Sequence, residues 1–147
     1  MKYAHEFVPG DEHEPLEFVI TPEYNQQILF SLEDFNPCYI ENDGGLPPIV
    51  HPVLLLHMSA RTRSTSFLLA PDMGSIFARD NACFLSPARV GNTLRVTWKV
   101  LDVFEKRGHN YQTMGADIHT EDGTHILHRE TDSTFFQRDA SNVAGDT

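Results

Sequence analysis

The chain has 147 residues, 40% hydrophobic and 22% charged, with a formal net charge of −10 at pH 7. This length and composition predict one globular domain, residues 1–147, with enough apolar residues for a real core. The acidic balance argues against a nucleic-acid partner or an anionic membrane surface, while permitting a local basic patch. No apolar run approaches the ~18 residues of a membrane span, so no membrane association is expected.

Residues 1–6 lack the apolar stretch of a secretory signal, so we expect a cytoplasmic protein. Cys38 and Cys83 do not have metal-site spacing. In that compartment we expect both cysteines to be reduced and buried rather than bridged.

The first third of the chain predicts an irregular segment over residues 1–15 and a short strand over residues 16–20. Thr21 is a suitable helix cap and Pro22 fits a first helical turn, so a helix is expected to begin here. It should end near Asp34, because Pro37 disfavours a helical conformation in the residue before it. The predicted apolar face of this helix consists of Tyr24, Ile28, Leu29 and Leu32.

The longest apolar run in the chain, residues 53–56, follows a loop over residues 40–50 that is rich in Gly and Pro. Pro52 suits a first helical position, and no Gly interrupts residues 51–67. We therefore predict a central helix of roughly 12–15 residues that is apolar nearly all round and must be wrapped by other elements.

From residue 75 onward the hydrophobic period changes to two, which indicates strands over residues 75–85, 93–106, 111–120 and 125–137. In the second of these the apolar positions change phase near Val100, which predicts a β-bulge. Asp122-Gly123 is a hairpin signal, and the polar tail, residues 138–147, is expected to fray. Short connections indicate an antiparallel meander. The predicted fold class is α+β: a single hot-dog domain, in which one antiparallel sheet curls around one long central helix.

The segment after the first helix resembles the active-site segment of MaoC-like hydratases and dehydratases, hot-dog proteins that act on acyl thioesters. Their catalytic pattern is Asp, any residue, Asn, Pro, an apolar residue and His, and Asp34, Asn36 and Pro37 match it in position. A second stretch is similar to a strand-entry motif of the family, with Asn in place of its usual Asp: Phe84, Pro87, Gly91, Asn92, Thr93 and Leu94. The resemblance covers residues ~16–137, nearly the length of one domain.

Tyr39 stands where the family has its catalytic His. Hydration needs a group that moves a proton near neutral pH, and Tyr, with an ordinary pKa near 10, is a poor base. The same replacement is similar to the non-catalytic half of two-domain MaoC-like dehydratases. The candidate catalytic residues implied by the resemblance are Asp34, Asn36 and Tyr39; without it, the segment is an ordinary helix stop followed by a turn.

The amino end of the central helix is the second candidate, with His51, Pro52, Val53 and Leu54 as substrate-binding residues. Free N–H groups at a helix start can hold a carbonyl oxygen as it gains charge. In hot-dog families this helix end is where the thioester carbonyl lies. The alternative is that His51 merely caps the helix or packs.

The last hairpin carries several histidines. A two-residue turn at Asp122-Gly123 would place Asp117 opposite His128 and His119 opposite Ile126, with all four on one face of the sheet. Two histidines and one aspartate could bind a metal, but no fourth ligand or supporting group can be named. We expect a solvent-facing polar patch and no metal.

The resemblance implies a coenzyme A thioester as the substrate and no other cofactor. Arginines could hold its phosphates, although the sequence does not show that they converge: Arg61, Arg63, Arg79, Arg89 and Arg95. Three functions stay open: an acyl-thioester hydratase or dehydratase, a non-catalytic binding subunit of a heteromeric dehydratase, and a hot-dog thioesterase. A homodimer, or a heterodimer with a related hot-dog chain, is expected because open sheet edges tend to be paired.

Overall fold

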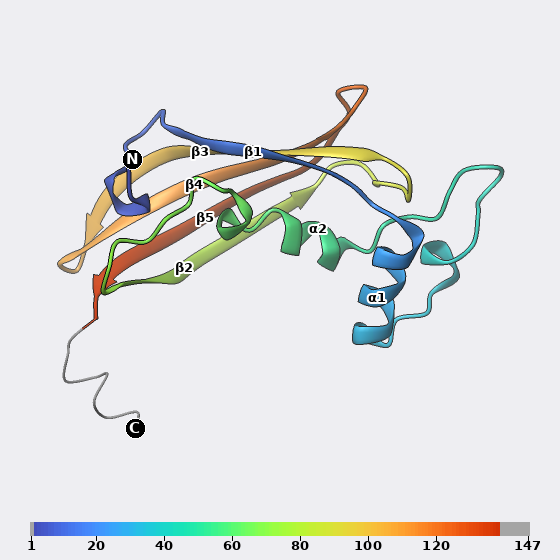
Figure 1. Cartoon of the computed structure of the whole chain (residues 1–147), viewed down its shortest axis with the longest axis horizontal. Helices are drawn as coiled ribbons and strands as arrows, with labels where there is room; N and C mark the ends of the chain where they lie inside the picture. The colour runs from blue at the N-terminus through green and yellow to red at the C-terminus, as the bar shows by residue number, and fades with distance from the viewer. Residues whose placement is uncertain (1, 139–147) are drawn as a thin grey trace.

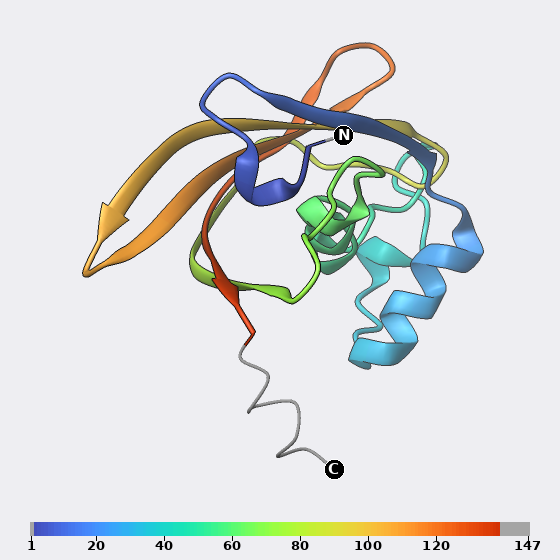
Figure 2. The same ribbon diagram turned by 60° about the vertical axis from the view of Figure 1, so that its left-hand side comes forward.

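The computed structural model describes residues 2–138. It contains one five-stranded antiparallel sheet, with strand order β1-β3-β4-β5-β2, and two α-helices. The strands are β1 (Glu12–Val19), β2 (Met73–Phe84), β3 (Thr93–Lys106), β4 (His109–Thr120) and β5 (His125–Gln137). The helices are α1 (Pro22–Leu32) and α2 (Pro52–Met58), with short 3₁₀ turns at Ala4–Glu6, Pro37–Tyr39 and Arg61–Arg63. The sheet curves over α2 and does not close into a barrel (Figure 2).

The predicted strands agree closely with the structure, but their order in the sheet was only partly predicted. Strands β3, β4 and β5 form the expected meander, and the register shift between Val100 and Asp102 confirms the bulge. The expectation that β2 continues this meander is wrong, because β2 pairs with β5 and lies on the edge opposite β1. No local pattern distinguishes these two placements, since both give an antiparallel pair.

The central helix is shorter than predicted, with the seven residues of α2 in place of 12–15. Its last carbonyls are bound by the sheet: Trp98 Nε1 donates to the Ser59 carbonyl at 2.9 Å, and Arg129 Nη1 donates to the Leu56 carbonyl at 2.8 Å. Without these donors, the last carbonyl groups of α2 would need the N–H groups of another helical turn. The positive charge of Arg129 also interacts favourably with the negative C-terminal end of the helix dipole.

Burial of α2 is also one-sided. Leu54, Leu55 and Met58 join the core, whereas Val53 and His57 are exposed, so the expectation of a helix wrapped on all sides is wrong. The core is otherwise built from inward residues of the sheet, with Trp98 only 1% exposed at its centre. Sheet and helix therefore form two layers, with α2 under the concave face (Figure 1).

The amino-terminal segment is more ordered than expected. Ala4 and Phe7 are buried, and Gln112 Nε2 donates to both of their carbonyls, at 3.1 and 3.2 Å. Strand β1 already begins at Glu12. The prediction of an irregular segment over residues 1–15 is thus wrong for residues 12–15, which belong to β1, and for the 3₁₀ turn Ala4–Glu6. The expected fraying of the tail concerns residues that, apart from Arg138, lie outside the described part.

Both cysteines are free, but Cys38 and Cys83 are exposed, which corrects the expectation that they are buried. Cys38 lies in the turn Pro37–Tyr39 and Cys83 near the end of edge strand β2. Within residues 2–138, no helix has both the length and the apolar character needed to cross a membrane.

Candidate active site

The candidate site lies where α1 ends and α2 begins. Helix α1 starts as predicted, because the Thr21 hydroxyl accepts the Tyr24 N–H at 3.1 Å. It ends at Glu33, which adopts a left-handed conformation with φ of 54°. This reversal turns the following residue, Asp34, back toward the start of α2.

Asp34 is held from two sides. Its Oδ1 accepts the Asn36 N–H at 3.2 Å, and its Oδ2 lies 3.0 Å from His51 Nε2. The hydrogen bond from His51, followed by that from the Asn36 backbone, lowers the pKa of Asp34 below its ordinary value of 3.8. Asp34 is therefore an ionised carboxylate at neutral pH, and its side chain is 40% exposed to solvent.

His51 has both ring nitrogens engaged. As the cap of α2, its Nδ1 accepts the Val53 N–H at 3.1 Å, so Nε2 carries the proton that is donated to Asp34. The side chain is only 10% exposed. This arrangement fixes one tautomer and makes His51 a donor that orients the Asp34 carboxylate.

Tyr39 completes the cluster. Its ring centroid lies 4.7 Å from that of His51, with the ring planes tilted by 46°. Burial, and to a lesser extent the neighbouring Cys38 and Asp34, raises the pKa of Tyr39 above 10.0. The hydroxyl therefore keeps its proton at neutral pH and is no substitute base for a histidine.

Asn25 is a site residue that sequence reasoning missed. It is 1% exposed on α1, its Nδ2 donates to the Tyr39 carbonyl at 3.2 Å, and its Oδ1 accepts the His51 N–H at 3.2 Å. One side chain thus ties together the two segments that carry Tyr39 and His51. The sequence carried one signal for Asn25, namely a polar residue on the inner face of an amphipathic helix. A buried polar side chain needs hydrogen-bond partners, so such a residue points to contacts with other segments.

The predicted substrate-binding residues at the start of α2 are placed differently from one another. Leu54 is fully buried in the core, and Val53 is exposed, but its N–H is already taken by His51. The Leu54 N–H bonds the His51 carbonyl at 3.0 Å, and Pro52 has no N–H. The structure thus brings Asp34, Asn36, Tyr39 and His51 together, while the first N–H groups of α2 are used within its own cap.

Two shallow concavities adjoin the cluster. One, of about 230 Å³, includes Asn25 and Tyr39 in its wall, and the other, of about 250 Å³, includes Phe30 and Phe35. Gln26 and Ile40 line both, so the two are neighbours along α1. The lining of the second is almost wholly apolar, which suits a hydrocarbon chain better than a charged group.

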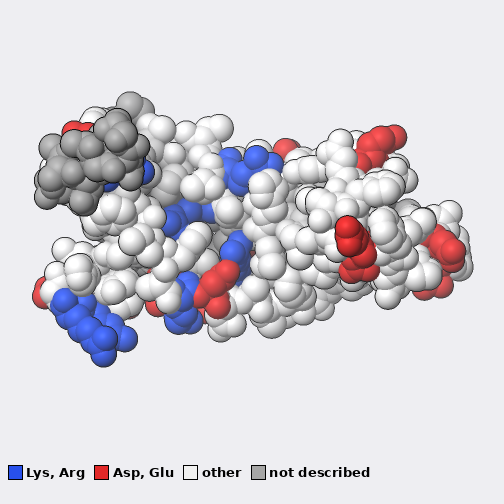
Figure 3. Space-filling view, turned by 90° about the horizontal axis from the view of Figure 1, so that it is seen from below, with Lys and Arg blue, Asp and Glu red and all other residues white. Residues whose placement is uncertain are grey.

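The five arginines considered for coenzyme A phosphates are dispersed. Four are already bonded to protein oxygens: Arg79 to Asp132, Arg95 to Glu17, Arg89 to the Pro47 carbonyl and Arg61 to the Ser75 hydroxyl. Arg61 is buried beside the Phe77 ring, and Arg63 lies against Met58. On the face that holds α2, basic side chains form separate small groups rather than one patch (Figure 3).

Comparison with known proteins gives matches in structure only, because no family model and no curated protein matches the sequence. The fold is similar to that of the (R)-hydratase from A. caviae involved in PHA biosynthesis, with a TM-score of 0.69 and 19% identity over 88% of this chain and 98% of that one. The MaoC-like dehydratase from Rhodospirillum rubrum gives a TM-score of 0.72 and 16% identity over 95% and 99% of the two chains.

A thioesterase superfamily member from Thermus thermophilus gives a TM-score of 0.61 and 16% identity over 93% and 88% of the two chains. The chain has a hot-dog fold. At these identities the likeness concerns the fold alone, and the three proteins differ in the activities that their names state. A choice of chemistry must therefore come from the cluster around Asp34.

Proposed function

We propose that the chain belongs with the MaoC-like proteins, binds an acyl-coenzyme A thioester, and adds water to or removes water from its acyl chain. The contact between Asp34 Oδ2 and His51 Nε2 at 3.0 Å is the observation that supports this most. It supplies a carboxylate–imidazole pair although Tyr39 stands at the family's usual histidine position. The imidazole comes instead from the cap of α2.

The proposed chemistry assigns the proton transfer to Asp34. Each of its oxygens accepts one protein donor and keeps a lone pair for water. In hydration, the water oxygen bonds to the β-carbon of an enoyl thioester while its proton passes to Asp34, which then protonates the α-carbon; dehydration is the reverse. His51 holds the carboxylate in place, and the protonated Tyr39 hydroxyl forms one wall of the site.

The substrate's acyl chain is assigned to the apolar concavity lined by Phe30, Phe35 and Ile40. These side chains are 68%, 53% and 48% exposed, which is unusual for large apolar groups gathered in one place. The concavity shares Gln26 and Ile40 with the one beside Tyr39, so a chain lying in it would extend toward Tyr39.

The proposed assembly is a dimer, either of two copies or with a related hot-dog chain. Strand β2 is an edge strand of 12 residues, and Ile76 and Phe77 on it are 54% and 51% exposed. Long apolar edges favour pairing with another strand. Sedimentation that gives a monomer at micromolar concentration, with no partner recovered from cell extract, would contradict this assembly.

The alternative function is a non-catalytic binding subunit of a heteromeric dehydratase. One observation favours it: none of the three groups of the cluster is a strong base. The pKa of Asp34 is lowered, the pKa of Tyr39 is raised, and His51 has no free nitrogen lone pair. Under this alternative the cluster shapes the pocket and a partner chain moves the proton.

A hydration assay separates the two functions. The purified chain is given a panel of enoyl-coenzyme A thioesters, and the loss of the conjugated double bond is followed by ultraviolet absorbance. Asp34→Asn should lower kcat by about 10²-fold or more, the usual scale for loss of a proton-transfer group. Glu33→Gln, which changes the adjacent exposed acid, is the matched control and should be unaffected.

Each outcome has a distinct meaning. Turnover that depends on Asp34 supports the hydratase. A wild-type chain that binds the thioesters without turnover, and gains activity only with a partner, supports the binding subunit. Turnover that is indifferent to Asp34→Asn would overturn both proposals.

A further inference from the structure

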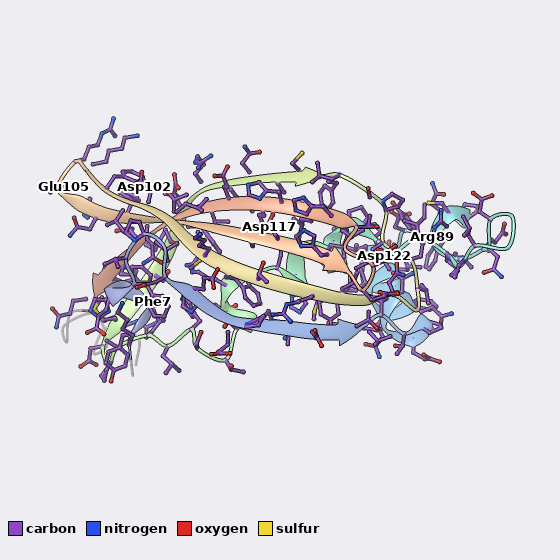
Figure 4. The ribbon with its side chains drawn as sticks, turned by 90° about the horizontal axis from the view of Figure 1, so that it is seen from above. Phe7, Arg89, Asp102, Glu105, Asp117 and Asp122 are labelled. Atoms are coloured by element: carbon purple, nitrogen blue, oxygen red, sulfur yellow. The ribbon has the colours of Figure 1, made fainter. Side chains whose placement is uncertain are left out.

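A second group of aspartate and histidine side chains lies on the convex face of the sheet, opposite α2. Asp117 on β4 places its Oδ1 2.8 Å from His125 Nε2 and 2.7 Å from His128 Nδ1, and both histidines belong to β5. The three ligand atoms lie within 4.8 Å of one another, the only such group found among residues 2–138. Figure 4 shows Asp117 near the middle of this face.

An irregularity in the β4–β5 pairing creates this group. Asp117 pairs with His128 as predicted, but the register shifts between Ile118 and His119, so that His119 pairs with His125. Ile126 turns into the core and is 0% exposed. The predicted pairing of His119 with Ile126 is therefore wrong, and the shift puts His125 on the outer face beside Asp117.

We propose that Asp117, His125 and His128 bind a divalent transition-metal ion of the Zn²⁺ type. Two imidazole nitrogens and one carboxylate oxygen form an established zinc ligand set, with a fourth position left to water. Bonds of about 2.0–2.2 Å require ligand atoms roughly 3.3–3.5 Å apart in a tetrahedral site. The Asp117 oxygen must therefore move away from the two nitrogens by roughly 0.5–0.8 Å, which rotation of this partly exposed side chain allows.

Groups around the ligands are suited to orient them. The free nitrogen of His128, Nε2, lies 3.8 Å from Glu130 Oε2, so a small shift gives the carboxylate–histidine pair that commonly supports a metal ligand. The His119 ring stacks on His125, with centroids 4.4 Å apart and planes within 7°, and this stacking holds the ligand ring in position.

The electrostatic setting favours a cation. The chain carries a net charge of −10, and Arg95, which pairs in register with His119 from β3, already forms an ion pair with Glu17 at 3.3 Å. Metal binding would replace the protons that the two imidazoles share with Asp117 and would fasten β4 to β5. The site lies on the face opposite Asp34, so the proposal is independent of the thioester function.

Calorimetric titration of the tag-free chain with ZnCl₂ tests this proposal. The wild type should bind one ion per chain, and Asp117→Asn, His125→Ala and His128→Ala should each weaken binding by about 10-fold or more. His109→Ala, which removes an exposed histidine from the far end of β4, is the matched control and should bind as the wild type does. Glu130→Gln should have a smaller effect than loss of a ligand.

Thermal melting provides a second readout, because an ion that binds only the folded chain raises the melting temperature. Zn²⁺ should raise it for the wild type and for His109→Ala but not for His128→Ala. Circular dichroism establishes that each variant is folded. Absence of saturable binding, or equal binding by the wild type and the three ligand variants, would overturn the proposal.

Discussion

Two arrangements of aspartate and histidine occupy opposite faces of the sheet, and they differ in what holds the second nitrogen of each imidazole. At Asp34, the single His51 has its Nδ1 bound to the Val53 N–H and its Nε2 bound to the carboxylate. At Asp117, two histidines share one oxygen, and the second nitrogen of His128 faces only Glu130, at 3.8 Å.

This difference separates a positioning role from a ligand role. His51 has both ring nitrogens bound to protein groups, so it can only orient Asp34. The histidines beside Asp117 can give up the proton that each shares with the carboxylate, and the nitrogen lone pair that this exposes can bind a metal. The supporting elements also differ, since the Asp34 pair joins a loop to a helix cap and the Asp117 group lies on two adjacent strands. The Asp34 pair should therefore be sensitive to changes in α2 and its neighbours, and the Asp117 group should not.

The largest effect is expected from Trp98→Ala, which should destabilise the fold by roughly 3–5 kcal/mol through lost burial. Trp98 is 1% exposed and also donates to the Ser59 carbonyl at the end of α2. Urea unfolding measures the loss, and Leu55→Ala should cost roughly 2–5 kcal/mol by the same mechanism. Unmoved urea midpoints in both variants would contradict the two-layer packing.

Asn25→Ala should cost roughly 1–3 kcal/mol, because it leaves the buried His51 N–H without a partner. It should also lower any turnover that depends on Asp34, while Zn²⁺ affinity at the Asp117 group stays unchanged. Gln27→Ala, an exposed neighbour on α1, serves as the control and should do neither. An equal loss of Zn²⁺ affinity would show that the two arrangements are coupled.

His51→Ala should cost roughly 0.5–2 kcal/mol, the range for loss of a helix cap. His125→Ala should stay within about 0.5 kcal/mol, since its side chain is partly exposed and makes no cap. The stability changes of the two variants are compared by thermal melting in the presence of a metal chelator. Equal stability changes would remove the distinction between the two roles.

The smallest change in the free energy of unfolding is expected on acidification. Hydrogen bonds from Arg129 lower the pKa of Asp80 below its ordinary value of 3.8, and those from His51 lower that of Asp34. A lowered folded-state pKa contributes stability that is present above the unfolded value and is lost as pH falls through the folded one. The part of the unfolding free energy that depends on Asp80 should thus be lost only below about pH 4, and Asp80→Asn should flatten that part of the decline. Burial also lowers the pKa of His13 below its ordinary value of 6.5, so a separate decline is expected at higher pH as His13 gains a proton in the unfolded chain. An acid limb that Asp80→Asn leaves unchanged would contradict the assignment to Asp80.

Local patterns predicted much of the fold. The Thr21 cap, the bounds of β3 and β5 and the bulge after Val100 all follow from neighbouring residues, and the structure confirms them. Two errors came from contacts between distant residues. Helix α2 ends early because Trp98 and Arg129 bind its carbonyls, and β2 pairs with β5 rather than β3, a choice between two antiparallel pairings that no local pattern makes.

The candidate site was predicted in part. Asp34, Asn36, Tyr39 and His51 were each named from the sequence, but their meeting was not, because 17 positions separate Asp34 from His51. Asn25, which joins the segments of Tyr39 and His51, gave only the weak signal of a polar residue on an inward helix face. The chain's role as hydratase, binding subunit or thioesterase stays a prediction.

The sequence by itself determined where strands, helix starts and turns lie, because caps, prolines and alternation act within a few residues of the chain. Only the tertiary structure decided which nitrogen of His51 meets Asp34 and that His125 rather than Ile126 joins Asp117. Both depend on the register of distant segments, and a shift of one residue in a strand moves a side chain to the other face of the sheet.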